Sequence, residues 1–511
     1  MQNTLKTEIK RLCRRAFARH ARETRKANEF RTKFTKRTGL PAGLPTSRPT
    51  NAPPDRHFDP RYCARNANLL AKVIWQKVLD KTYHPKPALS FRIPKSSGGF
   101  REVMAFTIPD AALANVVLRR TSQRNLKRLS PYSFAYHPDR NVFDAILALS
   151  NFVTEQRLFA VQIDFERYFD SIPSSYLKDH INDHNLISLT PHERYIIEEF
   201  MHHQHANQTE YPQSRFKRRH IGTPQGASVS LLLANLANNN LDRELERRPG
   251  RFVRFADDVV VLCSNFAEAE EVEAAFVEHC RASGLRINER KSPGIAIIGK
   301  KAGEAELRSY LTFDYLGYRF GKTGLDIPNS VRKRIFHKLS RLIHIYLIRY
   351  PTSYGFDSNR CSGGPQPYDW DLLGLILEIR GYLYGGLGEE ELRRFTSGQQ
   401  SGLQKMRGLM GFYTLLDDSK TLKYLDSWLL VQVRLAMRKR ANLLMSRYGH
   451  RGIEPSAEQL ILGTWLDQSA WRGSACPDPR LPSFVRGWRA ARKYYFTFGL
   501  EDVEPPFYGY Y

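Results

Sequence analysis

Arg254-Phe255-Ala256-Asp257-Asp258-Val259-Val260-Val261 places two adjacent carboxylates between two apolar runs. This composition predicts a β-hairpin whose tight turn carries Asp257 and Asp258. Two carboxylates this close repel each other, so the pair does not by itself stabilise a buried hairpin. A divalent cation removes the repulsion, and hard oxygen ligands of this kind suit magnesium. A solvated Asp-Asp turn explains the tetrapeptide equally well, so its partners elsewhere in the sequence decide between the two.

Length and composition describe a large, basic, globular chain. Its 511 residues are enough for two to four domains with buried cores. Hydrophobic residues make up 41% of the chain, which argues against a disordered protein, and the formal net charge is +26. A charge of this size favours a polyanionic partner, most simply nucleic acid, with an anionic membrane surface as the competing partner.

Neither a secreted nor a membrane-spanning protein is expected. No apolar run approaches the length of a spanning helix, and no apolar segment follows the basic N-terminus. The six cysteines are scattered without a Cys-x-x-Cys pair, which fits a reducing compartment and gives no zinc knuckle. We therefore expect a cytoplasmic protein without a membrane partner.

Residues 1–40 are strongly basic, with thirteen Lys or Arg residues against three Glu. Apolar residues recur there at roughly helical spacing, at Leu5, Ile9, Leu12, Phe17 and Ala21. The pattern predicts a basic amphipathic helix that contacts RNA or DNA phosphates, although a solvated charged face gives the same pattern. Six prolines between residues 41 and 60 then predict a linker, so residues 1–60 are expected to form an N-terminal extension.

A second hairpin is expected over residues 90–103. Two short strands flank Gly98-Gly99, and Lys95 and Arg101 lie on either side of the turn. A basic hairpin of this kind can fold over a triphosphate and hold it through charge-assisted hydrogen bonds. Taken alone, it is more simply a surface hairpin with two ordinary cations.

A further acidic residue, Asp164, directly follows the apolar run 158–163. The run predicts a buried strand followed by a turn into a helix. Asp164 can meet the Asp257-Asp258 turn only if the two strands are neighbours. Three carboxylates gathered in this way would form a site for two magnesium ions about 4 Å apart, able to bind the groups of an in-line phosphoryl displacement. Alone, Asp164 is equally well explained as a helix N-cap.

Gly222-Thr223-Pro224-Gln225-Gly226 predicts a tight loop that opens a long apolar helix. The loop presents Gln225 beside the backbone N–H groups of the helix start, an arrangement that suits a nucleotide and a template base. Upstream, His202, His203 and His205 lie within four residues. Because no carboxylate or cysteine stands at a suitable spacing, we expect a basic surface loop there rather than a zinc site.

Six motifs between residues 90 and 320 resemble, in order, those of bacterial reverse transcriptases of the group II intron and retron type. They are Arg92-Ile93-Pro94-Lys95 with Gly99-Phe100-Arg101, Ile163-Asp164-Phe165 with Phe169-Asp170-Ser171-Ile172, Gly222-Thr223-Pro224-Gln225-Gly226, Phe255-Ala256-Asp257-Asp258, Asn288-Glu289-Arg290-Lys291 and Tyr315-Leu316-Gly317-Tyr318. The resemblance implies an α+β right-hand polymerase with an α+β palm, β-rich fingers and a helical thumb. Residues 61–330 would form the fingers and palm, and residues 331–511 the basic helical thumb and C-terminal region.

The resemblance also implies the metal site. Asp164, Asp257 and Asp258 would be the catalytic and metal-ligating carboxylates, and the backbone carbonyl of Phe165 a further ligand. The implied cofactor is a pair of Mg²⁺ ions. In the family's mechanism, a 3′-hydroxyl activated by one ion attacks the α-phosphate while the second ion stabilises the leaving group.

Five further residues match substrate-binding positions of the family. Lys95 and Arg101 would grip the triphosphate, Gln225 would contact template and nucleotide, and Lys291 would lie near the leaving pyrophosphate. Phe169 stands five residues after Asp164, at the place of the steric gate. Its ring would exclude a ribose 2′-hydroxyl and so select deoxynucleotides.

Departures from the family pattern bear on the use of the enzyme. The turn has Phe255 where the family usually has Tyr, and Val229-Ser230-Leu231 replaces the usual Leu-Ser-Pro. The Val-Thr-Gly thumb motif of retrons and a zinc-type endonuclease cluster are both absent from the sequence. A stand-alone enzyme of this kind resembles the reverse transcriptases of anti-phage defence. A group II intron reverse transcriptase and maturase is the alternative, and a catalytically silent RNA-binding protein is a third.

The expected partners are an RNA template, in particular a structured non-coding RNA, the DNA product and deoxynucleoside triphosphates, and a homo-oligomer is left open. After residue 320 the sequence predicts basic helices with interleaved Tyr and Trp, which either contact a duplex or form a core. The tail carries Tyr508, Tyr510 and Tyr511. A phenol there could prime DNA synthesis, whereas an aromatic plug packed on the thumb is the simpler interpretation.

Overall fold

The computed structural model describes residues 1–42, 53–94, 98–137, 139–153, 158–299, 307–398, 406–473 and 475–499. The chain forms two compact units. The first contains the described residues of 1–24 and 47–312, and the second those of 25–46 and 313–510. The domain limits expected from the sequence stay a prediction.

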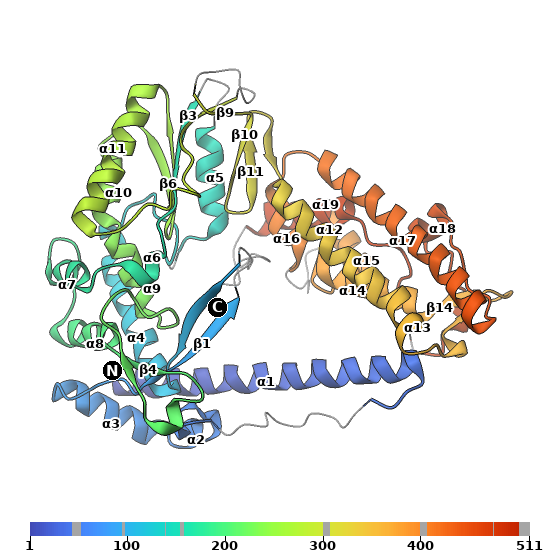
Figure 1. The fold of residues 1–511 in the computed structure, drawn as a ribbon, viewed down its shortest axis with the longest axis horizontal. Coiled ribbons are helices and arrows are strands. Elements are labelled where there is room, and N and C mark those ends of the chain that lie inside the picture. The colour runs from blue at the N-terminus through green and yellow to red at the C-terminus, as the bar shows by residue number, and fades with distance from the viewer. Residues whose placement is uncertain are drawn as a thin grey trace. The chain divides into compact units, whose positions relative to one another are not determined.

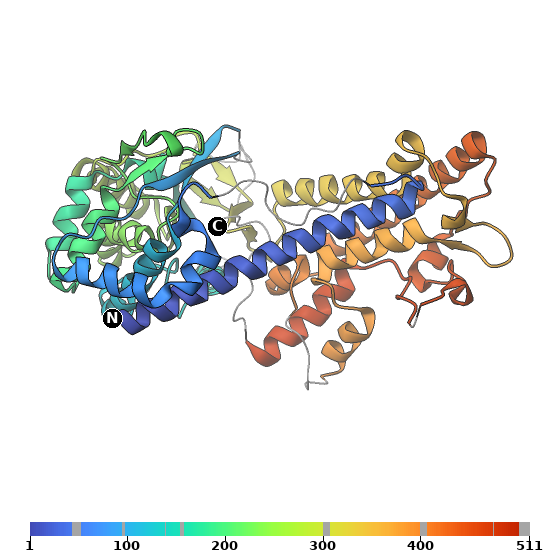
Figure 2. The same cartoon turned by 90° about the horizontal axis from the view of Figure 1, so that it is seen from below.

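The basic N-terminal segment forms one uninterrupted helix, α1 (Gln2–Thr38), which Figure 2 shows along its whole length. This confirms the predicted helix. In the first unit its apolar face is buried at Leu5, Ile9 and Cys13, but Phe17 is 39% exposed. The expected apolar stripe is therefore shorter than predicted, because the helix is no longer covered by the core after Cys13.

A buried carboxylate fixes the start of α1 in the first unit. Glu8 is 3% exposed and accepts hydrogen bonds from Arg11 on its own helix and from Asn115 and Arg119 on α4 (Ile108–Asn125). Burial alone raises the pKa of Glu8, but these hydrogen bonds outweigh it and lower the pKa to about 2. The ionised side chain thus binds α1 to α4.

A five-stranded sheet forms the centre of the first unit, in the order β6-β7-β3-β8-β9. Its strands are β3 (Leu158–Ile163), β6 (Arg251–Phe255), β7 (Asp258–Cys263), β8 (Gly294–Ile298) and β9 (Ser309–Tyr310). The two middle strands, β3 and β7, read as nearly continuous apolar runs, as expected for strands covered on both faces. In Figure 1 the sheet lies between α10 (Asn239–Glu246) and α11 (Phe266–Ser283) on one side and α5 (Val142–Phe152) on the other.

Local signals in the sequence fix the ends of the covering helices. α5 begins with a capping box in which Asn141 and Asp144 satisfy each other's backbone N–H groups. α11 begins at the side-chain cap of Asn265 and ends at Gly284, whose φ of +73° suits glycine. The other helices of this unit are α2 (Pro60–Arg65), α3 (Ala67–Leu79), α6 (Tyr168–Ser171), α7 (Ser174–Asn182), α8 (Pro191–Met201) and α9 (Val229–Ala237).

A second sheet of the first unit has the order β2-β1-β4-β5. It consists of β1 (Ala88–Pro94), β2 (Phe100–Ala105), β4 (Gln204–Ala206) and β5 (Lys217–Arg218). The antiparallel β1–β2 pair confirms the predicted hairpin, with Pro94 opposite Phe100. The expectation of a surface loop at the histidines is wrong, because His203 is 2% exposed and His205 lies in β4, where it pairs with β1.

The second unit is mainly helical. A small sheet of β10 (Thr312–Tyr315), β11 (Tyr318–Gly321) and β12 (Gly324–Asp326) opens it, followed by α12 (Asn329–Ile343), a π-helical turn (His344–Arg349) and α13 (Tyr350–Ser353). After the short pair β13 (Cys361–Ser362) and β14 (Tyr368–Asp369) come α14 (Trp370–Tyr384), α15 (Glu389–Ser397), α16 (Leu409–Phe412), α17 (Lys420–Tyr448), α18 (Ala457–Leu462) and α19 (Phe484–Phe498). The mixture of sheets and helices confirms the predicted α+β class.

Arg440 of α17 is the centre of a buried ion-pair network in this unit. It is 1% exposed and lies 2.7 Å from Asp369 and 2.9 Å from Asp371, which stand at the start of α14. Asp371 also pairs with Arg360 at 2.9 Å and with Arg37 at 3.3 Å. All five charged side chains of this network are thus paired within the second unit.

The aromatic residues of the second unit belong mostly to its core. Tyr346, Tyr350 and Tyr384 are 6%, 4% and 0% exposed, so for these three the core interpretation is correct. Tyr424 on α17 is 57% exposed and remains available for a partner. In the described part of the chain, no helix is long and apolar enough to cross a membrane. All six cysteines are described, and none is in a disulfide.

Candidate active site

The β6–β7 hairpin carries the acidic turn at its tip, as the sequence predicts. Phe255 lies opposite Asp258, so Ala256 and Asp257 form the two-residue connection. Ala256 adopts a φ of +63°, a left-handed conformation that is costly for a residue with a Cβ. A neighbouring group must therefore stabilise this turn.

That group is Arg254, whose role sequence reasoning missed. Its side chain is 0% exposed and donates to the carbonyl of Ala256 at 2.9 Å, while its other nitrogens bind Asp242 of α10 at 2.7 and 2.5 Å. It also donates to the Asn235 side chain at 3.1 Å. The available signal was an arginine at a buried position of a strand, one residue before an apolar residue and the acidic turn.

Strand pairing brings Asp164 to the acidic turn. β3 and β7 are antiparallel neighbours, with Ile163 opposite Val259. Asp164 follows Ile163, and Asp258 precedes Val259 on the antiparallel strand. The two aspartates therefore lie side by side at the same end of the sheet. The condition set from the sequence, that the two strands be neighbours, is met.

Three polar residues of the segment after α11 surround Asp164. Lys291 Nζ lies 2.8 Å from one Asp164 carboxylate oxygen, and Asn288 Nδ2 donates to the same oxygen at 3.2 Å. The Asp164 backbone N–H donates to Ser292 Oγ at 3.0 Å. Lys291 was expected near the leaving pyrophosphate, and in this structure it pairs with Asp164. Asn288 and Ser292 were not assigned roles from the sequence.

Both carboxyl groups of the turn have raised pKa values. Burial raises the pKa of Asp257 to about 6, with a further increase from the nearby Asp164. Burial and the neighbouring Asp257 and Asp164 raise the pKa of Asp258 to about 8. Lys291 and Arg101 oppose the shift at Asp257. A bound cation would oppose both the cost of burial and the repulsion between the carboxylates.

The donor chemistry fits magnesium. Asp164, Asp257 and Asp258 are hard oxygen donors, and Asp164 lies close enough to help raise the pKa values of Asp257 and Asp258. Within the described residues, no three side chains from His, Cys, Asp and Glu are already arranged around one point to hold a metal ion. Asp164 faces Lys291 instead. Binding a cation would therefore require Lys291 to leave the carboxylate, and its side chain is 63% exposed and can do so.

Phe165 and Phe169 follow Asp164 closely. Asp164 and Phe165 come directly after β3, and the ring of Phe165 is buried against Tyr168 and Phe276. Phe169 lies in α6, where its ring meets Tyr136 and Tyr168 edge to face. Aromatic packing thus fixes both residues close to Asp164, which neighbours the acidic turn.

The loop with Gln225 is fixed on β2. The Met104 N–H of β2 donates to the Gln225 carbonyl at 2.6 Å. A Cβ at Gly226, whose φ is +121°, would lie 2.0 Å from the Met104 carbonyl, so only glycine allows this approach. The predicted helix then begins at Val229. Gln225 itself is half-buried next to the hairpin that carries Arg101.

Several predicted positions lie elsewhere. Lys95 and the candidate priming residues Tyr508, Tyr510 and Tyr511 are outside the described residues. Tyr315 and Tyr318, in the stretch that resembles a primer grip, belong to the second unit, where they are 2% and 0% exposed.

Comparisons with known proteins bear on the class of the domain that contains these residues. Residues 93–320 match the family model described as reverse transcriptase (RNA-dependent DNA polymerase). A curated relative, the COX1/OXI3 intron 2 protein of Saccharomyces cerevisiae, is 25% identical over 166 residues, which are 32% of this chain and 18% of that protein. The chain thus matches less than a fifth of that relative's length.

Solved structures similar to this chain include telomerases. Apo telomerase from Candida tropicalis, truncated from its C-terminal domain, has a TM-score of 0.37 and 14% identity, over 52% of this chain and 60% of that one. Telomerase from Candida albicans in complex with a TWJ fragment of telomeric RNA has a TM-score of 0.37 and 11% identity, over 74% of this chain and 66% of that one. The family match, not these distant likenesses, assigns the domain. The predicted polymerase class is confirmed at the level of that match: residues 93–320 of this chain match the reverse transcriptase (RNA-dependent DNA polymerase) domain.

Proposed function

We propose that this protein synthesises DNA on an RNA template from deoxynucleoside triphosphates, with two magnesium ions at Asp164, Asp257 and Asp258. The observation that carries the proposal is the register of β3 and β7, which puts Asp164 beside the Asp257-Asp258 turn. A catalytically silent RNA-binding protein would not need to place Asp164 where it helps raise the pKa values of Asp257 and Asp258.

The residues around the carboxylates divide the remaining work. Arg101 and Lys291 supply positive charge for the triphosphate, and Gln225 is presented by a rigid loop toward the nucleotide and template. The ring of Phe169 excludes a ribose 2′-hydroxyl. Magnesium, when bound with the Phe165 carbonyl as an added ligand, would stabilise the charge on the attacking and leaving oxygens.

The direct test is primer extension by the wild-type protein on an RNA template with a DNA primer. We expect extension with deoxynucleotides and magnesium, and little with ribonucleotides. Extension that is absent on RNA, or as efficient with ribonucleotides, contradicts the proposal. A Phe169→Ala variant should incorporate ribonucleotides, which would identify the ring as the selective group.

RNA binding is assigned first to α1. Its middle exposes a run of cations that includes Arg15, Arg19 and Arg22, and their spacing places them on one face of the helix. Replacing these three with Gln should reduce the slope of log affinity against log salt by about 2 to 3. The control is the pair Arg247→Gln and Arg281→Gln, exposed cations of the first unit outside this helix. Equal slopes in all variants would mean that α1 presents only a solvated face.

The biological use has two candidates. The first is cytoplasmic anti-phage defence with a dedicated non-coding RNA, which follows from the sequence departures described above. The second is a group II intron reverse transcriptase and maturase, which the likeness to a yeast intron protein favours. Sequencing the nucleic acid that copurifies with the protein distinguishes them, because an intron RNA and a structured RNA encoded beside the gene differ in sequence and neighbourhood.

Priming is a separate question. A phenol of Tyr508, Tyr510 or Tyr511 would leave the product covalently attached to the polypeptide after RNase digestion and denaturation. Substituting all three with Phe would then release the DNA. Product that runs free after RNase digestion would assign the primer to a hydroxyl of the RNA.

A further inference from the structure

The loop that carries Gln225 is joined to the turn that carries Phe169. The Gly222 N–H donates to the Ile172 carbonyl at 2.8 Å, and the Thr223 N–H to the Phe169 carbonyl at 2.6 Å. A Cβ at Gly222, whose φ is +74°, would lie 2.5 Å from the Phe169 carbonyl oxygen. The two segments therefore approach as closely as backbones can, and any movement of one moves the other.

The side chain of Arg219 connects the two segments. Arg219 Nη2 lies 2.8 Å from Asp170 Oδ1, and Arg219 Nε donates to the Ile221 carbonyl at 2.9 Å. Its side chain is only 11% exposed. Its backbone N–H donates to the carbonyl of the buried His203 at 3.0 Å. The backbone of Arg219 is thus tied to the residue just before β4, and its guanidinium to Asp170 and the Ile221 carbonyl.

We propose that Arg219 is a positioning residue for sugar selection: by binding Asp170 and the Ile221 carbonyl together, it fixes the Phe169 ring relative to the loop of Gln225. Asp170 is the residue next to Phe169, and Ile221 precedes Gly222. If the bridge is lost, the gate can move away from the sugar while the catalytic carboxylates stay in place. The inference rests on the proposed polymerase function, because it names a determinant of that function's substrate choice.

A lysine cannot replace this arginine fully. An ammonium group is a point donor, whereas the planar guanidinium binds two acceptors in fixed directions. We therefore expect Arg219→Lys to retain part of the selectivity and Arg219→Gln to retain least. Asp170→Asn removes the charge from the other side of the same contact, so the double variant should be no worse than Arg219→Gln alone.

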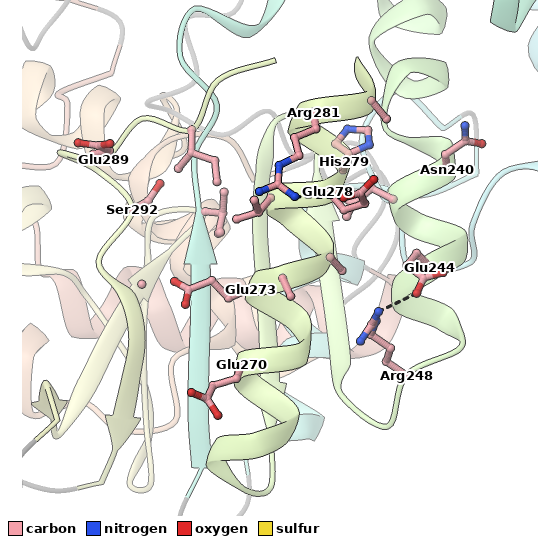
Figure 3. A pocket seen from close by; sticks show the side chains of 18 of the residues that line it. Asn240, Glu244, Arg248, Glu270, Glu273, Glu278, His279, Arg281, Glu289 and Ser292 are labelled. Atoms are coloured by element: carbon pink, nitrogen blue, oxygen red, sulfur yellow. Dashed lines mark hydrogen bonds and ion pairs between the residues drawn. The ribbon is translucent and has the colours of Figure 1, made fainter. Parts of the chain in front are cut away.

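The test compares kcat/KM for one deoxynucleotide and its ribonucleotide in primer extension on RNA. We expect Arg219→Gln to lower the ratio of the two about ten- to a hundred-fold, mainly through a higher kcat/KM for the ribonucleotide. The matched control is Arg248→Gln. Arg248 also forms a 2.8 Å pair, with Glu244, and is 24% exposed. Arg248 and Glu244 belong to the residues that line a hollow of about 1020 Å³ beside α10 and α11, and Figure 3 shows their ion pair.

A second readout reports on the contact without turnover. Hydrogen exchange at the amides of Gly222 and Thr223 should be faster in Arg219→Gln and unchanged in Arg248→Gln. Should Arg219→Gln fail to fold, Asp170→Asn and Arg219→Lys carry the same comparison. A ratio unchanged in the Arg219 and Asp170 variants, or lowered equally by Arg248→Gln, overturns the inference while leaving the polymerase function intact. A wild-type protein that makes no DNA overturns both.

Discussion

Two pairs of aspartates in this chain have opposite surroundings. In the second unit, Asp369 and Asp371 are almost completely buried, and the chain supplies Arg440, Arg360 and Arg37 as partners. In the first unit, Asp257 and Asp258 stand at a turn with pKa values raised to about 6 and about 8. The first arrangement is complete without a ligand. The second keeps raised pKa values, which fits the magnesium site proposed there.

The same contrast exists within the first unit. Asp242 lies close to the acidic turn in the fold, yet Arg254 satisfies both of its oxygens. Arg254 at the same time holds the strained carbonyl of Ala256. The chain therefore has arginines available near the turn and uses them for its scaffold. At Asp257 the nearby positive charge comes instead from Lys291, whose side chain is 63% exposed, and from Arg101.

The largest effect expected from this comparison is on catalysis. Replacing Asp257 and Asp258 by Ala should lower the rate of DNA synthesis at least about 10³-fold, because the groups that bind the ions are removed. RNA affinity, measured by filter binding at fixed salt, should stay close to that of the wild type. Asp314→Asn, an exposed residue of the second unit, is the control. Synthesis near the wild-type rate in the double variant would contradict the assignment.

The second effect is on stability and concerns Asp369 and Asp371, the buried aspartates that arginines pair with. Arg440→Met leaves two buried carboxylates without their main partner and should cost about 3–5 kcal/mol of unfolding free energy in the second unit. Arg438→Met on the same helix is the control, because Arg438 is 67% exposed and 3.9 Å from Glu454. We expect its cost to be below about 1 kcal/mol in a denaturant titration. Similar costs for the two variants would show that the network does not bear on stability.

The third effect is a ligand effect. Magnesium at about 100 times its dissociation constant should stabilise the wild-type protein by about 2.7 kcal/mol, seen as a higher unfolding temperature of the first unit. Removing the ion with a chelator should reverse the shift. Asp257→Asn combined with Asp258→Asn should abolish the response, and Arg440→Met should keep it. A shift that survives the double Asn variant would place the ion elsewhere.

The smallest expected effect concerns Glu8, a buried carboxylate of the first unit that arginines and an asparagine bind. Glu8 has its pKa lowered to about 2, so it favours folding above its unfolded value of 4.5 and this contribution is lost as the pH falls toward 2. Glu8→Gln should cost about 1–2 kcal/mol at pH 7 and progressively less below pH 4.5. Thermal unfolding of both proteins between pH 3 and 7 measures this. A difference that does not shrink with acidity would mean that Glu8 acts through shape and not charge.

Much of the fold could be predicted from local patterns. The apolar run before Asp164, the turn at Asp257 and the Gly98-Gly99 hairpin are read directly from alternation and turn residues. The α1 helix follows from its periodicity, although Phe17 shows that periodicity does not say where a covering surface stops. The histidines near residue 203 were misplaced on the surface, because a short buried strand carries too little local signal.

The supporting contacts could not be predicted. Arg254 with Asp242, Lys291 with Asp164 and Arg440 with Asp369 join residues 12, 127 and 71 positions apart. Each partner is one of many acids and bases of the chain, and the choice depends on which strands and helices pack together.

The sequence by itself determined the chemistry: hard oxygen donors at two strand ends, a glycine-rich loop and an excess of positive charge over the whole chain. These depend on residue types and short spacings, which the chain order preserves. Only the tertiary structure decided how far the protein balances the charge of each carboxylate. Burial and distance set that balance, and both arise when segments far apart in the sequence are brought into one core.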